Sequence, residues 1–256
     1  MRQRQITYIA IIFAVAILAG YVYLYQVGPL AEEWNNLLIY AADPFAALLA
    51  AISVTMVLIN YRREDKPYFV WAYFTVAMWV WVIAETIFVF VALSSGQDPK
   101  LSAADGFWFI GYFLLSLAIY LQYQLIAMTK IGWWKLAVIW VGVILLSPLL
   151  LFLLGHRLSD NDFVENWVAY LYPIVDFAIC IVSFHLYIVF GGGKLSRPWV
   201  GLLLLGVADL IWAWVNLGGG GDDTAIFVGD VVYVAAYLIL AIGFFRQYLL
   251  LKYGPD

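Results

Sequence analysis

Long apolar runs dominate the chain, and short polar segments separate them. A helix that crosses the hydrocarbon core of a bilayer needs about 20 mostly apolar residues. Eight stretches meet this requirement, and each predicts a transmembrane helix. They cover residues 6–26, 34–60, 68–93, 104–128, 133–154, 167–190, 199–217 and 224–251. Breaks such as Gly28-Pro29, Gly96 and Gly191-Gly192-Gly193 predict short turns between them.

The first apolar stretch raises the question of a cleaved secretory signal, because Arg2 and Arg4 precede it. The stretch is too long for a typical signal-peptide core, and no clear A-x-A cleavage site follows it. The sequence therefore favours a retained first helix.

Composition sharpens the fold class. Hydrophobic residues make up 66% of the 256 positions and charged residues 12%, which excludes a water-soluble domain and a disordered chain. One cysteine, Cys180, excludes a disulfide scaffold, and together with His156 and His185 it is too few for a zinc or iron–sulfur site. No basic patch suits nucleic acid. The prediction is an all-α, polytopic integral membrane protein with eight transmembrane helices and no cofactor.

The Lys and Arg residues predict the orientation. Eleven of the 13 fall in one set of loops, and only Lys100 and Arg157 fall in the other. Cytoplasmic loops carry the excess of positive charge in membrane proteins. We therefore expect a multi-pass protein of the cell membrane with both termini in the cytoplasm and acidic loops outside.

The sequence predicts an internal repeat of two four-helix halves, residues 1–131 and 132–256, against the alternative of chance similarity among apolar segments. Trp34 precedes Asp43 by nine positions, as Trp167 precedes Asp176. Further along, the corresponding pairs are Glu85 with Asp209, Asp105 with Asp230, and Tyr112 with Tyr237. Four helices per half give both halves one orientation, as in parallel-repeat membrane proteins.

Six acidic residues fall inside the predicted spans: Asp43, Glu85, Asp105, Asp176, Asp209 and Asp230. No Lys or Arg lies well inside a span to balance them. An ionisable group in the bilayer is costly and marks a candidate functional site. All six fall in the outer half of the membrane, so we expect a water-filled vestibule open to the outside. Four tyrosines share helix faces with these acids and complete the candidate ligand site: Tyr40, Tyr112, Tyr172 and Tyr237.

A structural reading of these acids stands beside the functional one. A protonated carboxyl can hold helices together by bonding a neighbouring backbone or tyrosine. Asp105 and Asp230 are expected in the first turns of their helices, where a carboxylate favours the positive end of the helix dipole. For these two the structural role is favoured. For Asp43, Glu85, Asp176 and Asp209 the functional role is favoured.

The segment 172–182 carries a Y-P-x-x-D pattern, the segment 201–216 carries an Ala208-Asp209 pair after Gly201 and Gly206, and the segment 229–244 carries a D-x-x-x-x-x-x-Y pattern. In these patterns the chain resembles the multi-pass N-terminal sensory region of bacterial and archaeal histidine kinases and diguanylate cyclases. The first half departs from it at Glu85, where Asp is usual. The resemblance implies a sensory class without a defined ligand. No kinase or cyclase domain is present, so the output is expected in a partner chain.

Four functions follow as alternatives. The favoured one is a sensory or ligand-binding module whose outer acidic pocket takes a cation, a cationic small molecule or a proton and signals to a cytoplasmic partner. The runner-up is a secondary transporter or cation/proton carrier that uses the same carboxylates. An intramembrane enzyme has thin support, because no catalytic motif appears and no catalytic residue is assigned; whether a metal binds stays open. A structural subunit of a membrane complex is the fourth.

Overall fold

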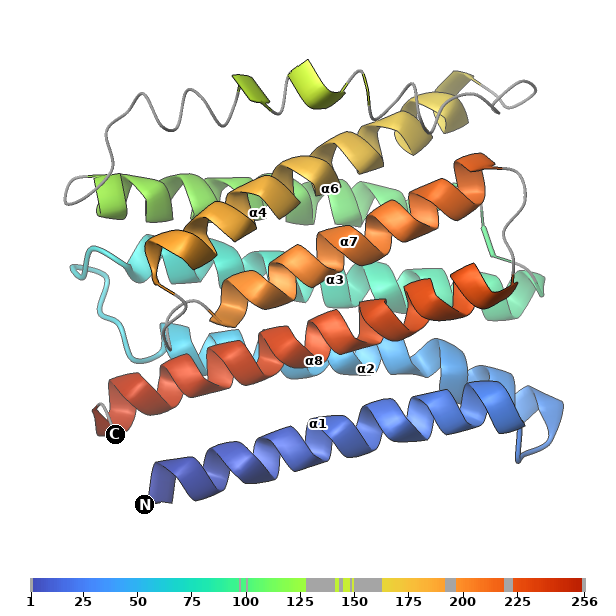
Figure 1. Ribbon diagram of the computed structural model, residues 1–256, viewed down its shortest axis with the longest axis horizontal. Helices are drawn as coiled ribbons and strands as arrows, with labels where there is room; N and C mark the ends of the chain where they lie inside the picture. The colour runs from blue at the N-terminus through green and yellow to red at the C-terminus, as the bar shows by residue number, and fades with distance from the viewer. Residues whose placement is uncertain are drawn as a thin grey trace. The chain divides into compact units, whose positions relative to one another are not determined.

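A computed structural model describes residues 2–96, 98–99, 101–127, 163–191, 197–218 and 223–254, with 141–142, 145–147 and 149. In these ranges the regular structure is helical, and no strand occurs (Figure 1). The long helices are α1 (Arg2–Val27), α2 (Glu32–Leu58), α3 (Tyr68–Ser95), α4 (Ala103–Ala127), α6 (Phe163–Val189), α7 (Arg197–Gly218) and α8 (Asp223–Tyr253).

All seven of these helices are long and apolar enough to cross a bilayer. Large apolar side chains also stay on their outer surfaces; Ile12 of α1, for example, is 67% exposed. Such a surface suits lipid and not water. The chain is thus a multi-pass helical membrane protein, and seven predicted spans are confirmed as helices. The predicted span 133–154 lies outside the described residues, apart from a few positions.

The turns follow their sequence signals. Gly96 ends α3 with a φ of 71°, and its N–H donates to the carbonyl of Ala92 at 2.9 Å. This left-handed conformation closes a helix and is strained for any residue with a Cβ. Pro44 and Pro173 lie inside α2 and α6, where each removes a backbone donor.

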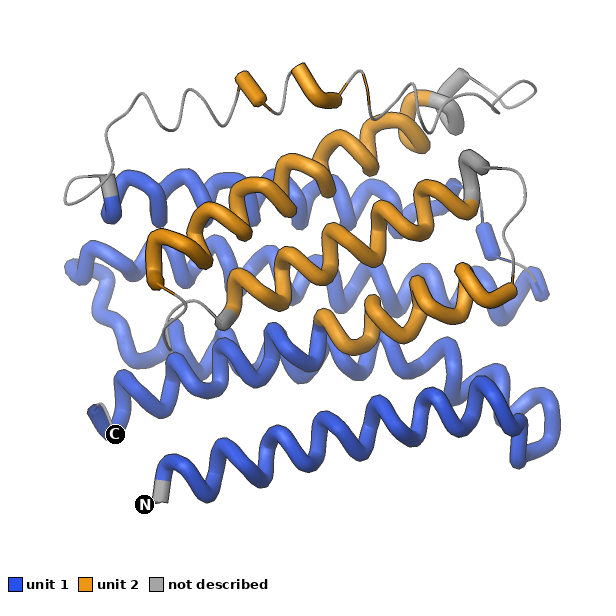
Figure 2. The backbone as a smooth tube through the Cα atoms, in the orientation of Figure 1, with its two compact units in different colours: residues 1–129, 237–256 blue, residues 130–236 orange. Residues whose placement is uncertain are grey.

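Two compact units make up the chain (Figure 2). Unit 1 contains Met1–Thr129 and Tyr237–Asp256, and unit 2 contains Lys130–Ala236. The second division falls inside α8, so this helix contributes to both. The repeat of residues 1–131 and 132–256 stays a prediction.

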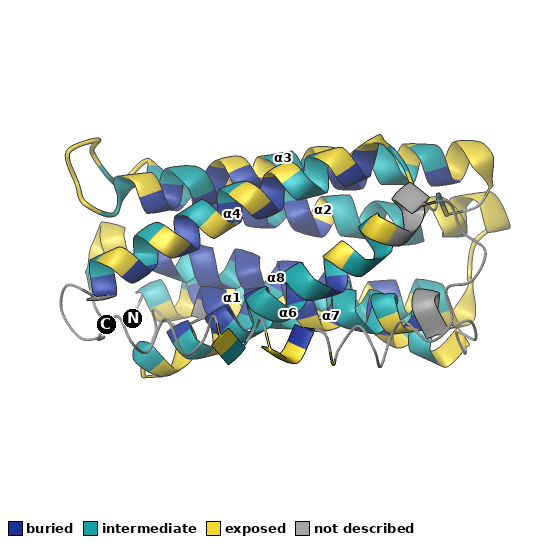
Figure 3. Cartoon of the chain, turned by 90° about the horizontal axis from the view of Figure 1, so that it is seen from above, coloured by how far each residue is buried: buried dark blue, intermediate teal, exposed yellow. Residues whose placement is uncertain are grey.

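Within unit 1, α3 packs closely against α2 and α4, while α1 contacts α2 only sparsely. The buried strip of α3 includes Trp71 and Phe74, which meet Phe244 of α8 edge-on with ring centroids 6.2 and 5.6 Å apart. Figure 3 shows this burial as dark blue faces along the helices. Within unit 2, α6 packs against α7. Burial thus selects one face of each helix, and lipid-compatible residues occupy the other.

Helix α1 begins, and helix α8 finishes, at the same end of unit 1. The side chain of Gln3 donates to the carbonyls of Leu249 and Gly254 at 3.4 and 3.0 Å. The turn after α2 belongs to this end as well, since Tyr61 bonds the side chain of Gln247. The described basic residues of unit 1 with placed side chains collect here: Arg4, Arg62, Arg63, Lys66, Arg246 and Lys252. Glu32, Glu33 and Asp98 lie at the opposite end.

Candidate functional site

Glu85 is the best-defined buried acid of unit 1. It lies ten residues before the end of α3, roughly 15 Å along the helix, and is 3% exposed. Its Oε1 accepts hydrogen bonds from Tyr237 Oη of α8 at 2.8 Å and from Trp108 Nε1 of α4 at 3.2 Å. One carboxyl oxygen therefore joins three helices. Hydrogen bonds from neutral donors lower the cost of a carboxyl in this apolar setting.

Aromatic rings enclose this carboxyl cluster. Trp81, one turn before Glu85, is 2% exposed and donates from Nε1 to the carbonyl of Trp108 at 3.3 Å. Its ring meets Tyr112 and Tyr237 edge-on, with centroids 5.3 and 6.5 Å away. Edge-to-face pairs of this kind contribute beyond the area they bury. The rings fix the direction of the Tyr237 hydroxyl, and Tyr112 belongs to the same cluster.

Close packing of α4 on α3 completes the cluster. At Gly111 an added Cβ would overlap the indole of Trp81. A side chain here would push α4 away from α3 and lengthen the bond from Trp108 to Glu85. The glycine is therefore required by the contact and not by its backbone conformation.

Asp105 has a local structural role at the start of α4. Its Oδ2 accepts from the N–H of Ser102 at 2.7 Å, and Ser102 Oγ accepts from the N–H of Ala104 at 3.1 Å. This is a variant of the capping box: the Asp105 carboxylate bonds the N–H of Ser102, while the Ser102 hydroxyl bonds the N–H of Ala104, one residue before Asp105. Asp105 lies in the first turn, as predicted, whereas Asp230 lies two turns into α8 and is half-buried.

Asp43 and Tyr40 lie on α2, and both are half-buried. Tyr40 Oη donates to Oδ1 of Asp98 at 3.0 Å. Asp98 belongs to the segment after α3, so this bond ties the outer parts of two neighbouring helices together. Tyr40 thus binds an acid at the acidic end of unit 1, about one helical turn before Asp43.

In unit 2, Asp176 of α6 is fully buried. Asp209 of α7 is half-buried, and both carboxyls lie within electrostatic reach of the Cys180 thiol. Two of the predicted acids thus lie on neighbouring helices near the same thiol. Tyr172, one turn before Asp176, is half-buried on the same helix.

Gly206 explains how α6 and α7 approach at this point. A Cβ at this position would lie 2.7 Å from Cys180 Sγ and 2.9 Å from the carbonyl oxygen of Asp176. Cys180 Sγ also donates to the carbonyl of Leu203 at 3.5 Å. Small residues at helix contacts allow this closeness in membrane proteins.

Sequence reasoning missed the partners of Glu85. Trp108 was not singled out, and Tyr237 was paired with Asp230 by helical spacing and not with Glu85. Trp108 follows Asp105 by three residues, so the two side chains share a face of α4. This spacing is a sequence signal that could have identified Trp108. For the Glu85–Tyr237 pair no sequence signal existed, since the two residues are 152 positions apart.

Among the residues with described side chains, no group of three or more His, Cys, Asp or Glu gathers as a metal site. Comparison with known proteins adds no relative: no family model, no curated protein and no solved structure matches this chain. The resemblance to sensory regions of kinases and cyclases therefore stays an expectation from the quoted motifs.

Proposed function

We propose that the protein is a sensory module of the cell membrane whose intramembrane carboxyls respond to a proton, a cation or a cationic small molecule. The observation that carries the proposal is the placement of Glu85, which is buried at membrane depth and bonded by Tyr237 and Trp108. A carboxyl that gains a proton or binds a cation changes its charge and its capacity to accept those bonds. The packing of α3, α4 and α8 then responds, because all three meet at that oxygen.

The signal leaves through the basic end of unit 1, which we assign to the cytoplasm by its excess of Arg and Lys. Helix α8 continues from Tyr237 to this end and finishes with Lys252 in its last turn. The turn before α3 is held by a bond from the N–H of Arg62 to Asp65 Oδ2 at 2.6 Å. Arg62, Arg63 and Lys66 remain exposed there, which suits an acidic surface of a cytoplasmic partner.

Infrared difference spectroscopy of the chain in nanodiscs tests the proposal. Between about pH 6 and pH 9, and on addition of sodium or choline, the wild type is expected to lose a carboxylic acid C=O band. Glu85→Gln should remove part of that change, whereas Glu64→Gln, in an exposed turn, should leave it intact. Identical spectra for Glu85→Gln and wild type would overturn the role of Glu85.

Asp176 and Asp209 lie on the packed helices α6 and α7 within electrostatic reach of the same thiol, and this supports a transporter as the second candidate, since intramembrane carboxyls also suit coupling ions. Flux of sodium or protons into proteoliposomes separates the two functions. Flux that is lost in Asp176→Asn and Asp209→Asn favours the transporter. A structural subunit of a larger complex would show neither response and would copurify with stoichiometric partners.

A further inference from the structure

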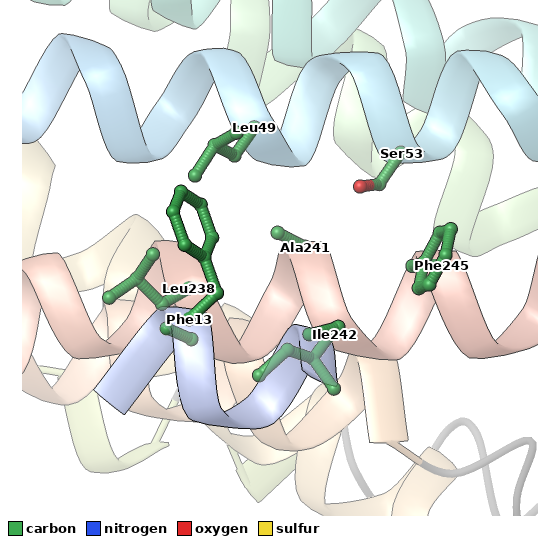
Figure 4. Close-up of a pocket in the computed structure, with 9 residues that line it drawn as sticks. Phe13, Leu49, Ser53, Leu238, Ala241, Ile242 and Phe245 are labelled. Atoms are coloured by element: carbon green, nitrogen blue, oxygen red, sulfur yellow. The ribbon is translucent and has the colours of Figure 1, made fainter. Parts of the chain in front are cut away.

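A separate apolar crevice lies within unit 1, between α1, α2 and α8. It has a volume of about 180 Å³, and Figure 4 shows Leu49 and Ser53 of α2 facing Leu238 and Ala241 of α8. Ala10 and Phe13 supply the wall on α1. The crevice exists because small side chains, alanine and serine, occupy facing positions of three helices. It is separate from the Glu85 cluster, with which it shares no lining residue.

The surroundings of the crevice decide what fills it. Its lining is almost entirely apolar, and an apolar cavity of about 150 Å³ stays free of water and takes up apolar molecules. Phe13 borders the crevice and is 55% exposed, so the crevice reaches the helix surface that the bilayer covers. The sparse contact of α1 with α2 leaves room for a chain to enter from the side.

The basic end of unit 1 lies next to the crevice. Gln3 precedes Ala10 by seven residues and Lys252 follows Phe245 by seven, so each shares a helix face with the lining. The bonds from Gln3 to Leu249 and Gly254 close α1 onto α8 just beyond the crevice. Lys252 therefore lies about where the phosphate of a lipid would be if its acyl chain occupied the crevice, and Arg4 and Arg246 belong to the same basic end of unit 1. Cations in this position attract anionic lipid headgroups.

We propose that this crevice binds one acyl chain of an anionic phospholipid from the leaflet at the basic end, with its headgroup held by the neighbouring Lys and Arg side chains. In this proposal the acyl chain contacts α1, α2 and α8 and fills the gap that their small side chains leave. This proposal is independent of the sensory function.

Lipid retention by the full-length chain tests it. The wild type is purified from a mixture of phosphatidylglycerol and phosphatidylcholine, washed with detergent, and weighed by native mass spectrometry. We expect one retained phosphatidylglycerol per chain. Ala10→Phe fills the crevice and should lower retention about tenfold, while Ala16→Phe, an exposed position of the same helix, should not.

The headgroup contact has its own variant, which leaves the crevice unfilled. Lys252→Gln should lower retention about fivefold, since one cation near anionic lipid contributes about that factor, and Lys66→Gln should leave it unchanged. If Ala10→Phe does not fold, the Lys252→Gln result and the preference for phosphatidylglycerol still test the proposal. Equal retention of both lipids by the wild type, or full retention in Lys252→Gln and Ala10→Phe, would overturn it.

Discussion

Tyr237 donates its hydroxyl to Oε1 of Glu85 at 2.8 Å, across 152 positions of sequence. The bond places the last helix of the chain against α3 at a depth where water does not compete. Tyr237 is fully buried and Glu85 nearly so. Because the Glu85 carboxyl accepts this bond, a change in its charge changes how α8 packs against α3.

Tyr237→Phe removes this bond while keeping the ring against Trp81. We expect the free energy of unfolding to fall by about 0.5–1.5 kcal/mol, the range for a lost internal hydrogen bond in water and in membranes. Unfolding in mixed micelles measures it. Tyr253→Phe on the same helix, where the ring is 51% exposed, is the control and should change stability little. Equal effects at both positions would contradict the special role of the Tyr237 hydroxyl.

Gly111→Ala tests the contact between α3 and α4. The new methyl group would overlap Trp81, so we expect a loss of about 1–3 kcal/mol, as for other overpacked sites. Gly106→Ala is the matched control on the same helix, because a Cβ there meets no atom of the described chain within 4 Å. It should be neutral or stabilise by up to about 1 kcal/mol, through helix propensity. A stable Gly111→Ala protein would show that α4 can move away from Trp81 at little cost.

The capping box at the start of α4 predicts non-additive mutations. Ser102→Ala and Asp105→Ala should each lower stability by about 1 kcal/mol, and the double variant should cost less than their sum. Thermal unfolding of the four proteins completes the cycle. If the stability losses of the two single variants add up in the double variant, Asp105 has a role beyond the cap and is again a candidate ligand-binding residue.

Tyr61 predicts a loss of stability at alkaline pH. Burial, ahead of the charge of Asp65, raises the pKa of its phenol above the ordinary value of about 10, although bonds with Trp71 and Gln247 oppose the shift. The folded state then holds the proton more tightly than the unfolded state. Stability is complete below pH 10 and falls as pH rises through the higher, folded-state pKa.

Replacing Tyr61 with Phe should flatten this alkaline decline. Unfolding temperatures of wild type and Tyr61→Phe between about pH 8 and pH 11 measure the difference. Tyr8→Phe, with a ring that is 63% exposed, provides the reference. A decline of the same steepness in wild type and Tyr61→Phe would assign the alkaline effect to other groups.

The sequence by itself determined the helices. Their length and apolar character follow from the need to satisfy every backbone group inside a bilayer, which only a long apolar helix or a closed barrel can do. Seven predicted spans became α1, α2, α3, α4, α6, α7 and α8 with ends shifted by a few residues. The sequence also placed Glu85 and Asp176 inside predicted spans, and the structure shows that both side chains are buried.

Tertiary structure alone decided the partners. Helical spacing relates residues three, four or seven apart, so it paired Tyr237 with Asp230 and Tyr112 with Asp105. The bond of Tyr237 to Glu85 depends on which helices lie side by side, and apolar helices offer no pattern that selects their neighbours. Packing details such as Gly111 against Trp81 and Gly206 against Cys180 make that selection, because dispersion contacts and hydrogen bonds depend on close approach between surfaces that are equally apolar in sequence.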